Sequence, residues 1–491
     1  MRIPEPVGAL FSAVAGASLV LAFAPFSLGW LAPVSLAFLF HFWARLKDAK
    51  QAFVQGWCFG MGLFGFGVFW LHHSIGQFGG LDTPLAILIT LLFAAFLALF
   101  PAVTGYLVAL FHSRPAGRVV LIPAAWVLIE WLRSWLFGGF TWLSLGYSQT
   151  DTPLAGYGTL LGVYGISLLV VLSAVLLTQW RKLWIWPVLL SLYLGGWGLL
   201  HYTWVTPTGQ WVKVAMVQAN IPQQRKWLPE EFKPTLKLYT RLSEEQPDAA
   251  LVVWPETAVT AFAHQVEKGF LQPLHERMLA EGRDLILGIP VRQGDDGYFN
   301  AMLSLGLSGR GEYFKRHLVP FGEYMPFSRW LGPLVAWLKI PMSSFSAGEQ
   351  SKPLIQLVGL PAGVSICYED TFGNEVLQAL PEAAFLINAS NDAWFGDSLA
   401  PYQHLQMARM RSIETGRYLL RATNTGISAI IDEKGRIQQQ LPLFQQGVLS
   451  GGFQPMQGST GFDYWGNRAV VWLCGLLVVL AWGWFRRGGT G

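Results

Sequence analysis

Residues 363–370 have the sequence Gly-Val-Ser-Ile-Cys-Tyr-Glu-Asp, an apolar run that ends in the thiol of Cys367 with two acidic residues just beyond it. Such a run predicts a buried strand that opens onto a loop or a helix. Strand ends in α/β sheets are where reactive groups are presented, so Cys367 is a candidate nucleophile. The alternative for a lone cysteine is a small buried apolar side chain at a strand end.

Two other predicted strand ends carry the groups that a thiol nucleophile needs. A thiol reacts once a base or a nearby cation has helped it lose its proton. Val252-Val-Trp-Pro-Glu256 brings Glu256 to the end of an apolar run, where desolvation raises the pKa of a carboxylate towards the range useful for a base. Tyr313-Phe-Lys315 places an ammonium that can stabilise a thiolate and an oxyanion. Each group alone is weak evidence for a catalytic site, because strand-end Glu and Lys residues commonly face water. Together with Cys367, however, they supply a base, a cation and a nucleophile.

The chain around these motifs alternates short β-rich runs with amphipathic stretches from Trp211 onwards. This alternation predicts an α/β layered domain of about 250 residues. We expect strands at 212–218, 251–254, 285–289, 301–305, 313–319, 363–367, 384–388 and 426–431, and helices at 229–245, 265–281 and 402–415.

The first part of the chain has a different composition. Charged residues make up 13% of the sequence and hydrophobic residues 52%, against about 25% charged in an average soluble domain. Only 14 of the 64 charged residues precede Lys213. These values exclude a disordered chain and an ordinary cytosolic enzyme, and a net charge of +4 is too small and too scattered to favour nucleic acid. The sequence therefore predicts a lipid-embedded part joined to a water-exposed part.

Eight apolar segments are candidate membrane spans, since a bilayer core needs about 20 apolar residues per helix. A signal peptide is the alternative for the first, but no small-residue cleavage pattern follows it. The predicted spans are 7–24, 28–43, 53–71, 84–111, 119–137, 159–180, 183–200 and 469–485.

The short loops indicate an orientation, because Lys and Arg concentrate on the cytoplasmic side. Basic residues in alternate loops place both termini in the cytoplasm and the α/β domain outside it. We therefore expect a seven-span domain over 1–205, an extracytoplasmic catalytic domain over 206–465 and an eighth span with a cytoplasmic tail over 466–491. Glu130 and Arg133 share a helix face, and we interpret them as charges that orient a helix, with a lipid-headgroup or substrate role as the alternative.

The three cysteines support a chemical role for Cys367. Cys58 and Cys474 fall inside predicted spans, so Cys367 has no partner in its own domain. Domains on the oxidising side of a membrane usually pair their cysteines or lack them. A lone thiol in that compartment favours a reactive function.

The motifs together resemble the carbon-nitrogen hydrolase (nitrilase) superfamily, which has an αββα fold and a Glu-Lys-Cys triad. Because membrane spans flank the domain on both sides, the whole chain resembles the apolipoprotein N-acyltransferase family. The stretches that carry the resemblance are Gln218-Ala-Asn-Ile-Pro-Gln, Trp254-Pro-Glu-Thr, Lys315-Arg-His-Leu-Val-Pro-Phe-Gly-Glu-Tyr, Cys367-Tyr-Glu-Asp and Asn388-Ala-Ser-Asn-Asp-Ala-Trp-Phe.

The resemblance implies a multi-span α-helical membrane domain plus a nitrilase-like domain on the periplasmic side of the bacterial inner membrane. It also implies a two-step reaction. An acyl chain passes from a phospholipid, typically phosphatidylethanolamine, to a cysteine thioester, and then to the α-amine of the S-diacylglyceryl cysteine that begins an apolipoprotein. One base serves both halves, which predicts ping-pong kinetics.

The resemblance also implies roles for individual residues. Glu256 would be the general base, Lys315 the oxyanion stabiliser and Cys367 the nucleophile. The accessory or substrate-binding positions would be Glu323, Glu369, Tyr368, Trp227 and Phe321.

The stretch from Phe321 to Ile340 is an apolar, aromatic insertion in an otherwise charged domain. Aromatic residues favour a membrane interface, so we predict a mobile lid over 326–345 that rests on lipid, with ordinary core as the alternative. We expect no metal and no other cofactor, because the histidines His72, His73, His317 and His404 lack the spacing of a metal site. With little polar surface on the spans, a monomer is the simplest expectation.

Two other functions fit parts of the sequence. A membrane-tethered amidase or nitrilase acting on a small amide would use the same triad. A transporter with a soluble binding domain is disfavoured, because the predicted spans carry few of the ionisable groups that ion-coupled transport requires.

Overall fold

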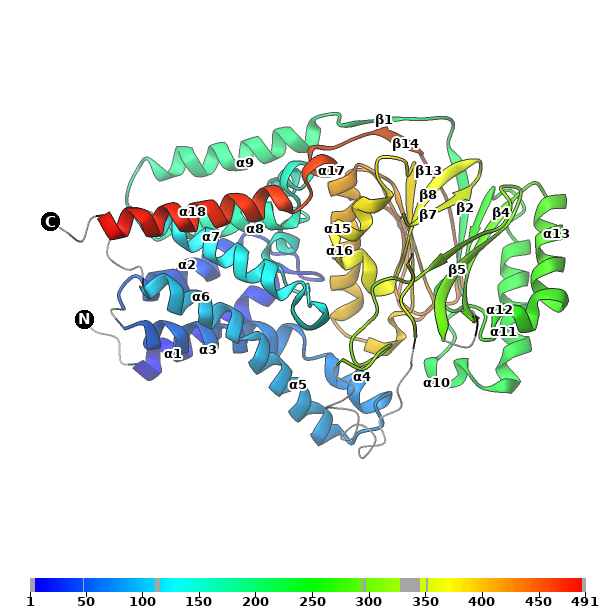
Figure 1. The fold of residues 1–491 in the computed structure, drawn as a ribbon, viewed down its shortest axis with the longest axis horizontal. Coiled ribbons are helices and arrows are strands. Elements are labelled where there is room, and N and C mark those ends of the chain that lie inside the picture. The colour runs from blue at the N-terminus through cyan, green and yellow to red at the C-terminus, as the bar shows by residue number, and fades with distance from the viewer. Residues whose placement is uncertain are drawn as a thin grey trace. The chain divides into compact units, whose positions relative to one another are not determined.

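The structure of the protein, a computed structural model, describes residues 5–46, 48–110, 115–292, 294, 297–326, 345–349 and 352–487. The chain forms two compact units. The helical unit contains residues 1–77, 81–202 and 464–491, and the αβ unit contains residues 78–80 and 203–463. Figure 1 shows their elements.

Each predicted span coincides with one or two helices of the helical unit (Figure 1). A turn after Gly67 divides the predicted third span, and a break at Ala98 divides the fourth. The helices are α1 (Glu5–Leu19), α2 (Leu31–Trp43), α3 (Ala49–Gly67), α4 (Leu71–Gln77), α5 (Thr83–Leu97), α6 (Leu99–Leu110), α7 (Pro115–Arg133), α8 (Gly158–Leu177), α9 (Ile185–His201) and α18 (Arg468–Arg487).

Among the described residues, two helical runs are long and apolar enough to cross a membrane, Thr83–Leu110 and Pro153–Leu177. The α3–α4 pair, bent by 58°, would make a third if it is counted as one span. Four shorter apolar helices are Val7–Ala22, Leu31–Trp43, Ile185–His201 and Arg468–Ala481. The unit is thus helical and rich in apolar helices, while the count of eight spans stays a prediction.

Glu130 and Arg133 of α7 bind an irregular buried segment that follows the helix. The Glu130 carboxylate accepts a hydrogen bond from the backbone N–H of Leu145 at 3.1 Å, and Arg133 donates to the carbonyls of Phe140 and Trp142, each at 2.7 Å. Buried backbone groups outside helices need such partners. The two charged side chains therefore anchor a loop, a role that their helical spacing did not predict.

The αβ unit contains two six-stranded sheets and a two-stranded ribbon. Sheet one has the order β13-β2-β3-β4-β5-β6, sheet two has the order β12-β11-β10-β9-β8-β7, and β1 pairs with β14. The strands of sheet one are β2 (Val212–Gln218), β3 (Leu251–Val253), β4 (Asp284–Arg292), β5 (Tyr298–Gly306), β6 (Gly311–Phe314) and β13 (Gly447–Phe453). Those of sheet two are β7 (Leu354–Leu357), β8 (Leu360–Ile366), β9 (Phe385–Ser390), β10 (Leu419–Thr423), β11 (Ser428–Ile431) and β12 (Ile437–Leu441), and the ribbon is β1 (Val205–Pro207) with β14 (Met456–Gly458).

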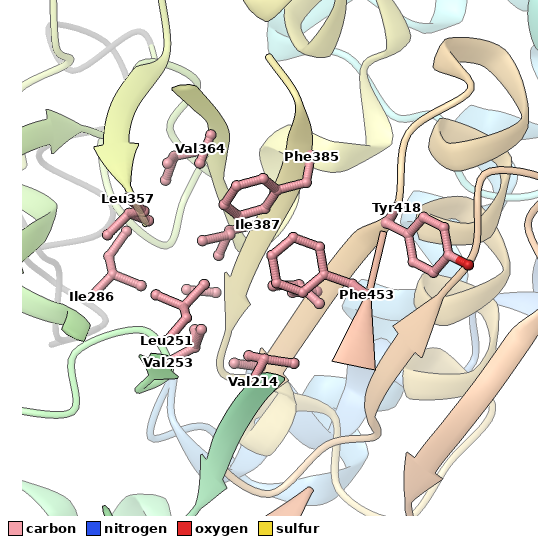
Figure 2. Close-up of a cluster of buried hydrophobic side chains, with 14 of the residues drawn as sticks. Val214, Leu251, Val253, Ile286, Leu357, Val364, Phe385, Ile387, Tyr418 and Phe453 are labelled. Atoms are coloured by element: carbon pink, nitrogen blue, oxygen red, sulfur yellow. The ribbon is translucent and has the colours of Figure 1, made fainter. Parts of the chain in front are cut away.

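A continuous apolar core joins the two sheets. Figure 2 shows side chains of both sheets meeting there, and the rings of Phe385 and Phe453 lie 4.6 Å apart. Burial of such side chains is the main stabilising contribution in a layered fold. The labelled members are Val214, Leu251, Val253 and Ile286 of sheet one, Leu357, Val364, Phe385 and Ile387 of sheet two, and Tyr418 and Phe453.

Helices cover the outer faces of both sheets. Leu236 and Leu242 of α11 (Pro229–Glu244) and Met278 of α13 (Gln272–Ala280) pack on sheet one, and Leu405 and Ala408 of α16 (Ala400–Thr415) pack on sheet two. The αβ unit is therefore an αββα sandwich, which agrees with the α/β layered domain predicted from the sequence pattern and with the αββα fold that the resemblance implied. Its remaining helices are α10 (Gln223–Lys226), α12 (Ala263–Val266) and α15 (Gly373–Val376), and α17 (Gly461–Trp465) precedes α18.

Some predicted elements were wrong in extent. The strand expected over 313–319 ends at Phe314, because the backbone N–H groups of Arg316 and His317 donate to the side chain of Glu369 rather than to a neighbouring strand. The helix expected over 265–281 is α12, a π-helical turn and α13 in succession. The strand expected at 363–367 stops at Ile366, which leaves Cys367 on the following turn.

Candidate active site

Glu256 lies just beyond β3, where Pro255 turns the chain out of sheet one. Its side chain is nearly buried, with 10% of its surface exposed. The turn packs directly on Gly288 of β4. A Cβ atom there would lie 2.4 Å from the Thr257 nitrogen and 2.5 Å from the Pro255 oxygen. Gly288 therefore lets the turn that carries Glu256 approach the sheet.

Lys315 follows β6 directly and is held against the neighbouring strand by its backbone, whose N–H donates to the Asn300 carbonyl at 2.8 Å. Its ammonium donates to Glu323 Oε1 at 2.8 Å and lies 3.7 Å from Glu256 Oε1. The Lys315 side chain is 1% exposed. One buried ammonium thus bridges two carboxylates.

Two further side chains complete this group, and the sequence alone indicated neither. Asn300 Nδ2 donates to Glu256 Oε1 at 2.7 Å and lies 3.3 Å from Glu323 Oε1. Lys226 Nζ donates to the backbone oxygen of Glu256 at 3.1 Å. Lys226 is buried although it stands in a polar stretch beside Trp227, so the local sequence carries no sign of its position.

Cys367 begins a 3-10 turn after β8 and has a backbone φ of 51°, a left-handed conformation that is strained for a residue with a side chain. The carboxylate of Glu369 stabilises this turn. It accepts the N–H of Ile366 at 2.7 Å, the N–H of Arg316 at 2.7 Å and the N–H of His317 at 3.1 Å. Glu369 therefore ties the turn of Cys367 to the segment that follows Lys315.

The pKa values in this group are shifted by burial and by neighbouring charges. Burial raises the pKa of Glu256, against the opposing charge of Lys315. Burial alone would lower the pKa of Lys315, but the charges of Glu323 and Glu256 raise it well above its ordinary value. Burial, and then the charge of Glu256, raises the pKa of the Cys367 thiol, while Lys315 lowers it. The thiol is thus neutral at rest, and its proton has a nearby carboxylate to accept it.

Lys226 is a second buried cation beside this group. Burial lowers its pKa to about 8, and the charge of Glu256 opposes that shift. With Lys226 included, two carboxylates face two ammonium groups.

The predicted accessory residues fall into two sets. Glu323 joins the charged group through Lys315, and its second oxygen accepts the N–H of Val319 at 2.8 Å. Glu369 is buried, and its hydrogen bonds go to internal backbone groups and to Tyr313. Tyr368 is buried, and its ring packs against the rings of His317 and Phe372. Trp227 and Phe321 are 53% and 57% exposed. The lid predicted over 326–345 lies almost entirely outside the described residues, since 327–344 are among those that the structure does not describe.

A second group of buried charges lies beyond the Cys367 turn. This ion cluster consists of Asp370, Asp392, His404 and Arg421, whose side chains are all 0% exposed. His404 contacts Asp370 and Asp392, each at 2.9 Å. Arg421 donates to Asp370 at 3.1 Å and to Asp392 at 2.9 Å. The spacing of the histidines predicted a structural role for His404, but the sequence did not indicate the cluster.

Ionisation in the cluster is fixed by these contacts. Burial alone would raise the pKa of Asp392, but Arg421 and His404 lower it well below its ordinary range. Burial and Arg421 lower the pKa of His404, but the two aspartates raise it to about 9. Asp392 and His404 therefore stay charged near neutral pH.

The thiol, carboxylate and ammonium that the resemblance singled out lie at strand ends of an αββα sandwich, and the family match places the chain in the carbon-nitrogen hydrolase class of enzymes. Residues 213–458 match the family model described as carbon-nitrogen hydrolase, and residues 15–176 match the one described as apolipoprotein N-acyltransferase N-terminal domain.

Relatives extend this match over the whole chain. The chain is 43% identical to the apolipoprotein N-acyltransferase of Methylococcus capsulatus, over 98% of this chain and 97% of the relative. It is 44% identical to the apolipoprotein N-acyltransferase of Nitrosomonas europaea, over 94% of this chain and 95% of the relative. The chain therefore belongs to the apolipoprotein N-acyltransferase family and is an acyltransferase.

A solved structure with similarity to this chain is Saccharomyces cerevisiae Nit3, a member of branch 10 of the nitrilase superfamily. The two are 20% identical, with a TM-score of 0.38, over 51% of this chain and 93% of that chain.

Proposed function

We propose that this protein moves an acyl chain from a phospholipid, with phosphatidylethanolamine as the donor, onto Cys367 and then onto the α-amine of the S-diacylglyceryl cysteine of an apolipoprotein. The single observation that carries the proposal is the shared ammonium of Lys315, 2.8 Å from Glu323 and 3.7 Å from Glu256. It supplies a cation beside a carboxylate whose pKa is raised by burial, and both act on the charge state of the Cys367 thiol.

In the first half of the reaction, Glu256 accepts the thiol proton as the sulfur attacks the carbonyl carbon of the donor ester. The carbon–sulfur bond forms, and the carbonyl oxygen becomes an oxyanion that Lys315 stabilises. Collapse of this intermediate breaks the bond to the glycerol oxygen. Glu256 returns the proton to that oxygen, a lysophospholipid leaves, and the acyl chain stays on Cys367 as a thioester.

In the second half, the acceptor enters as an ammonium and must lose a proton before it can attack. Glu256 takes that proton and releases it to solvent, and the neutral amine attacks the thioester carbon. The carbon–sulfur bond breaks, an amide forms, and the sulfur regains a proton from the attacking nitrogen by way of Glu256. Water competes with the amine, so a site with little water and access to lipid favours transfer over hydrolysis.

The membrane arrangement belongs to the same proposal. Seven spans over 1–205 and one over 466–491 would hold the catalytic domain of 206–465 on the periplasmic side of the bacterial inner membrane, with both termini in the cytoplasm. The apolar helices of the helical unit support a membrane location, and a monomer suffices for the reaction, since all the proposed catalytic residues belong to one chain.

The experiment is a mass measurement on the purified full-length protein in detergent. Incubation with phosphatidylethanolamine alone should add the mass of one acyl chain, and neutral hydroxylamine, which cleaves thioesters, should remove it. Cys367→Ser should abolish the gain. Cys58→Ala and Cys474→Ala are matched controls and should acylate like the wild type.

Addition of a diacylglyceryl peptide with a free amine should discharge the acyl-enzyme and yield the N-acyl peptide. Discharge at the same rate with or without the peptide would favour hydrolysis, as in the amidase alternative. A protein that never gains mass from phospholipid would contradict the proposal.

A further inference from the structure

Ser390 lies next to the candidate nucleophile through the pairing of two parallel strands. In the register of β8 and β9, Ile366 faces Ala389, so the residues that follow them, Cys367 and Ser390, are neighbours at the same sheet edge. Hydrogen bonding by the neighbouring Ser390 hydroxyl lowers the pKa of the Cys367 thiol, against the larger effect of burial. Ser390 is 0% exposed, so water does not replace this contact.

The same hydroxyl has a second partner in the ion cluster. Ser390 Oγ donates to Asp392 Oδ1 at 3.1 Å. Arg421 and His404 hold this carboxylate in place, each at 2.9 Å from one of its oxygens. A hydroxyl has a single proton to donate, so Ser390 cannot donate to Asp392 and to a thiolate at the same time.

The charges around Cys367 show why a hydrogen bond from Ser390 to the sulfur matters. Once Glu256 has taken the thiol proton and is neutral, a thiolate there faces the carboxylate of Asp392, which disfavours it, and the ammonium of Lys315, which favours it. A buried anion that still faces a carboxylate needs every available donor. In the neutral state the thiol can donate to Ser390 Oγ while the hydroxyl donates to Asp392.

We propose, building on the function proposed above, that Ser390 is a further catalytic residue. Its hydroxyl turns from Asp392 to the sulfur as the thiol proton passes to Glu256, and it turns back when the carbon–sulfur bond forms. Asp392 is then a positioning residue that holds the hydroxyl ready.

The test uses the full-length protein in detergent with Cys58 and Cys474 replaced by alanine, so that Cys367 is its only thiol. The rate of alkylation by iodoacetamide is measured against pH. Ser390→Ala should move the midpoint of this profile to higher pH by about one unit and slow acylation by phosphatidylethanolamine about 10- to 100-fold, the range expected for a hydrogen bond to a charged group. Ser390→Thr keeps the hydroxyl and should restore the profile.

Ser428→Ala is the matched control. Ser428 is likewise buried in sheet two, but its hydroxyl bonds Gln218 and Thr423 rather than the sulfur, so its alkylation profile should equal that of the parent. Ser390→Gly, with the same expected shift as the alanine variant, serves if that variant does not fold.

An unchanged alkylation profile in a folded Ser390→Ala or Ser390→Gly protein overturns the proposal, whatever the acylation rate. Alkylation needs no lipid. A parent protein that never acylates would therefore contradict the proposed function alone, and the profile would still decide the role of Ser390.

Discussion

Two groups of buried charges lie near the Cys367 turn, and the pKa values of their carboxylates are shifted in opposite directions. In the ion cluster, two aspartates face Arg421 and His404, all at 0% exposure and with contacts of 2.9–3.1 Å. In the group of Glu256, Lys315 and Glu323, one ammonium serves two carboxylates, and the contact to Glu256 is 3.7 Å.

The pKa shifts follow this difference. In the cluster, partners outweigh burial, so the pKa of Asp392 falls and that of His404 rises, and both side chains keep their charges. At Glu256, burial outweighs the partners and the pKa rises. The comparison teaches that burial alone does not make a carboxylate a base. A carboxylate becomes one where burial is only partly offset by a shared cation.

Removal of a cation from the cluster should have the largest effect. Arg421→Met leaves two buried aspartates with His404 alone, and breaking a buried charge pair costs about 3–5 kcal/mol. We expect the thermal unfolding midpoint to fall by roughly 10 °C, measured by tryptophan fluorescence. Arg241→Met removes an exposed arginine paired with Glu245 and should change stability by about 0.5 kcal/mol or less. Equal shifts of the unfolding midpoint in the two variants would show that the ion cluster contributes no more to stability than an exposed ion pair.

Glu256→Gln should leave the fold intact and remove the proposed general base. The amide oxygen can still accept the hydrogen bond from Asn300, and Lys315 retains Glu323, but the amide cannot take a proton. Loss of a general base slows reactions about 10²- to 10⁴-fold, and the rate of acyl-enzyme formation by mass measures it. Glu267→Gln changes a partly exposed carboxylate paired with Arg310 and should acylate normally. A wild-type rate in Glu256→Gln would reassign the base.

The smallest expected effect is a pH dependence of stability from His404. Its pKa is raised to about 9 in the folded protein, against about 6.5 when unfolded. Its contribution to stability is therefore fully present below about pH 6.5 and is lost as pH rises through about 9. The lowered pKa of Lys226 has the opposite effect, so the difference between the wild type and His404→Gln isolates the histidine.

We expect the unfolding midpoint of the wild type to fall by on the order of 5 °C more than that of His404→Gln between pH 6.5 and 9.5. Parallel curves for the two proteins would mean that His404 keeps its ordinary pKa.

The sequence predicted the parts of the αβ unit that are encoded locally. Apolar runs that end at Glu256 or Cys367 mark strand ends without any knowledge of the partner strands, whereas the strand before Lys315 was expected to continue to residue 319 and ends at Phe314. The sequence did not indicate β10, because Arg421 lies in the middle of that strand. A charged residue predicts an exposed position, whereas Arg421 is buried. The edge strand β12, with the sequence Ile-Gln-Gln-Gln-Leu, has no alternating apolar pattern.

The contacts that complete the site could not be predicted for a related reason. Lys226, Asn300 and Ser390 approach the site from segments far apart in the chain, and their burial follows from sheet order and register, which one sequence does not specify. In the helical unit, apolar composition located the helices that fall within predicted spans. It did not indicate α4, of which only Leu71 lies in a predicted span, or the bend between α3 and α4, because an apolar stretch remains apolar across a break in the helix.

The glycine beneath the Glu256 turn limits which sequences can carry this site. Any side chain at position 288 would collide with main-chain atoms at 2.4–2.5 Å, and main-chain atoms cannot rotate aside as the end of a flexible side chain can. Even alanine would therefore displace the carboxylate from its lysine without altering a single charged residue. Engineering of new substrate preferences in this scaffold has to leave that position untouched and draw its diversity from elsewhere.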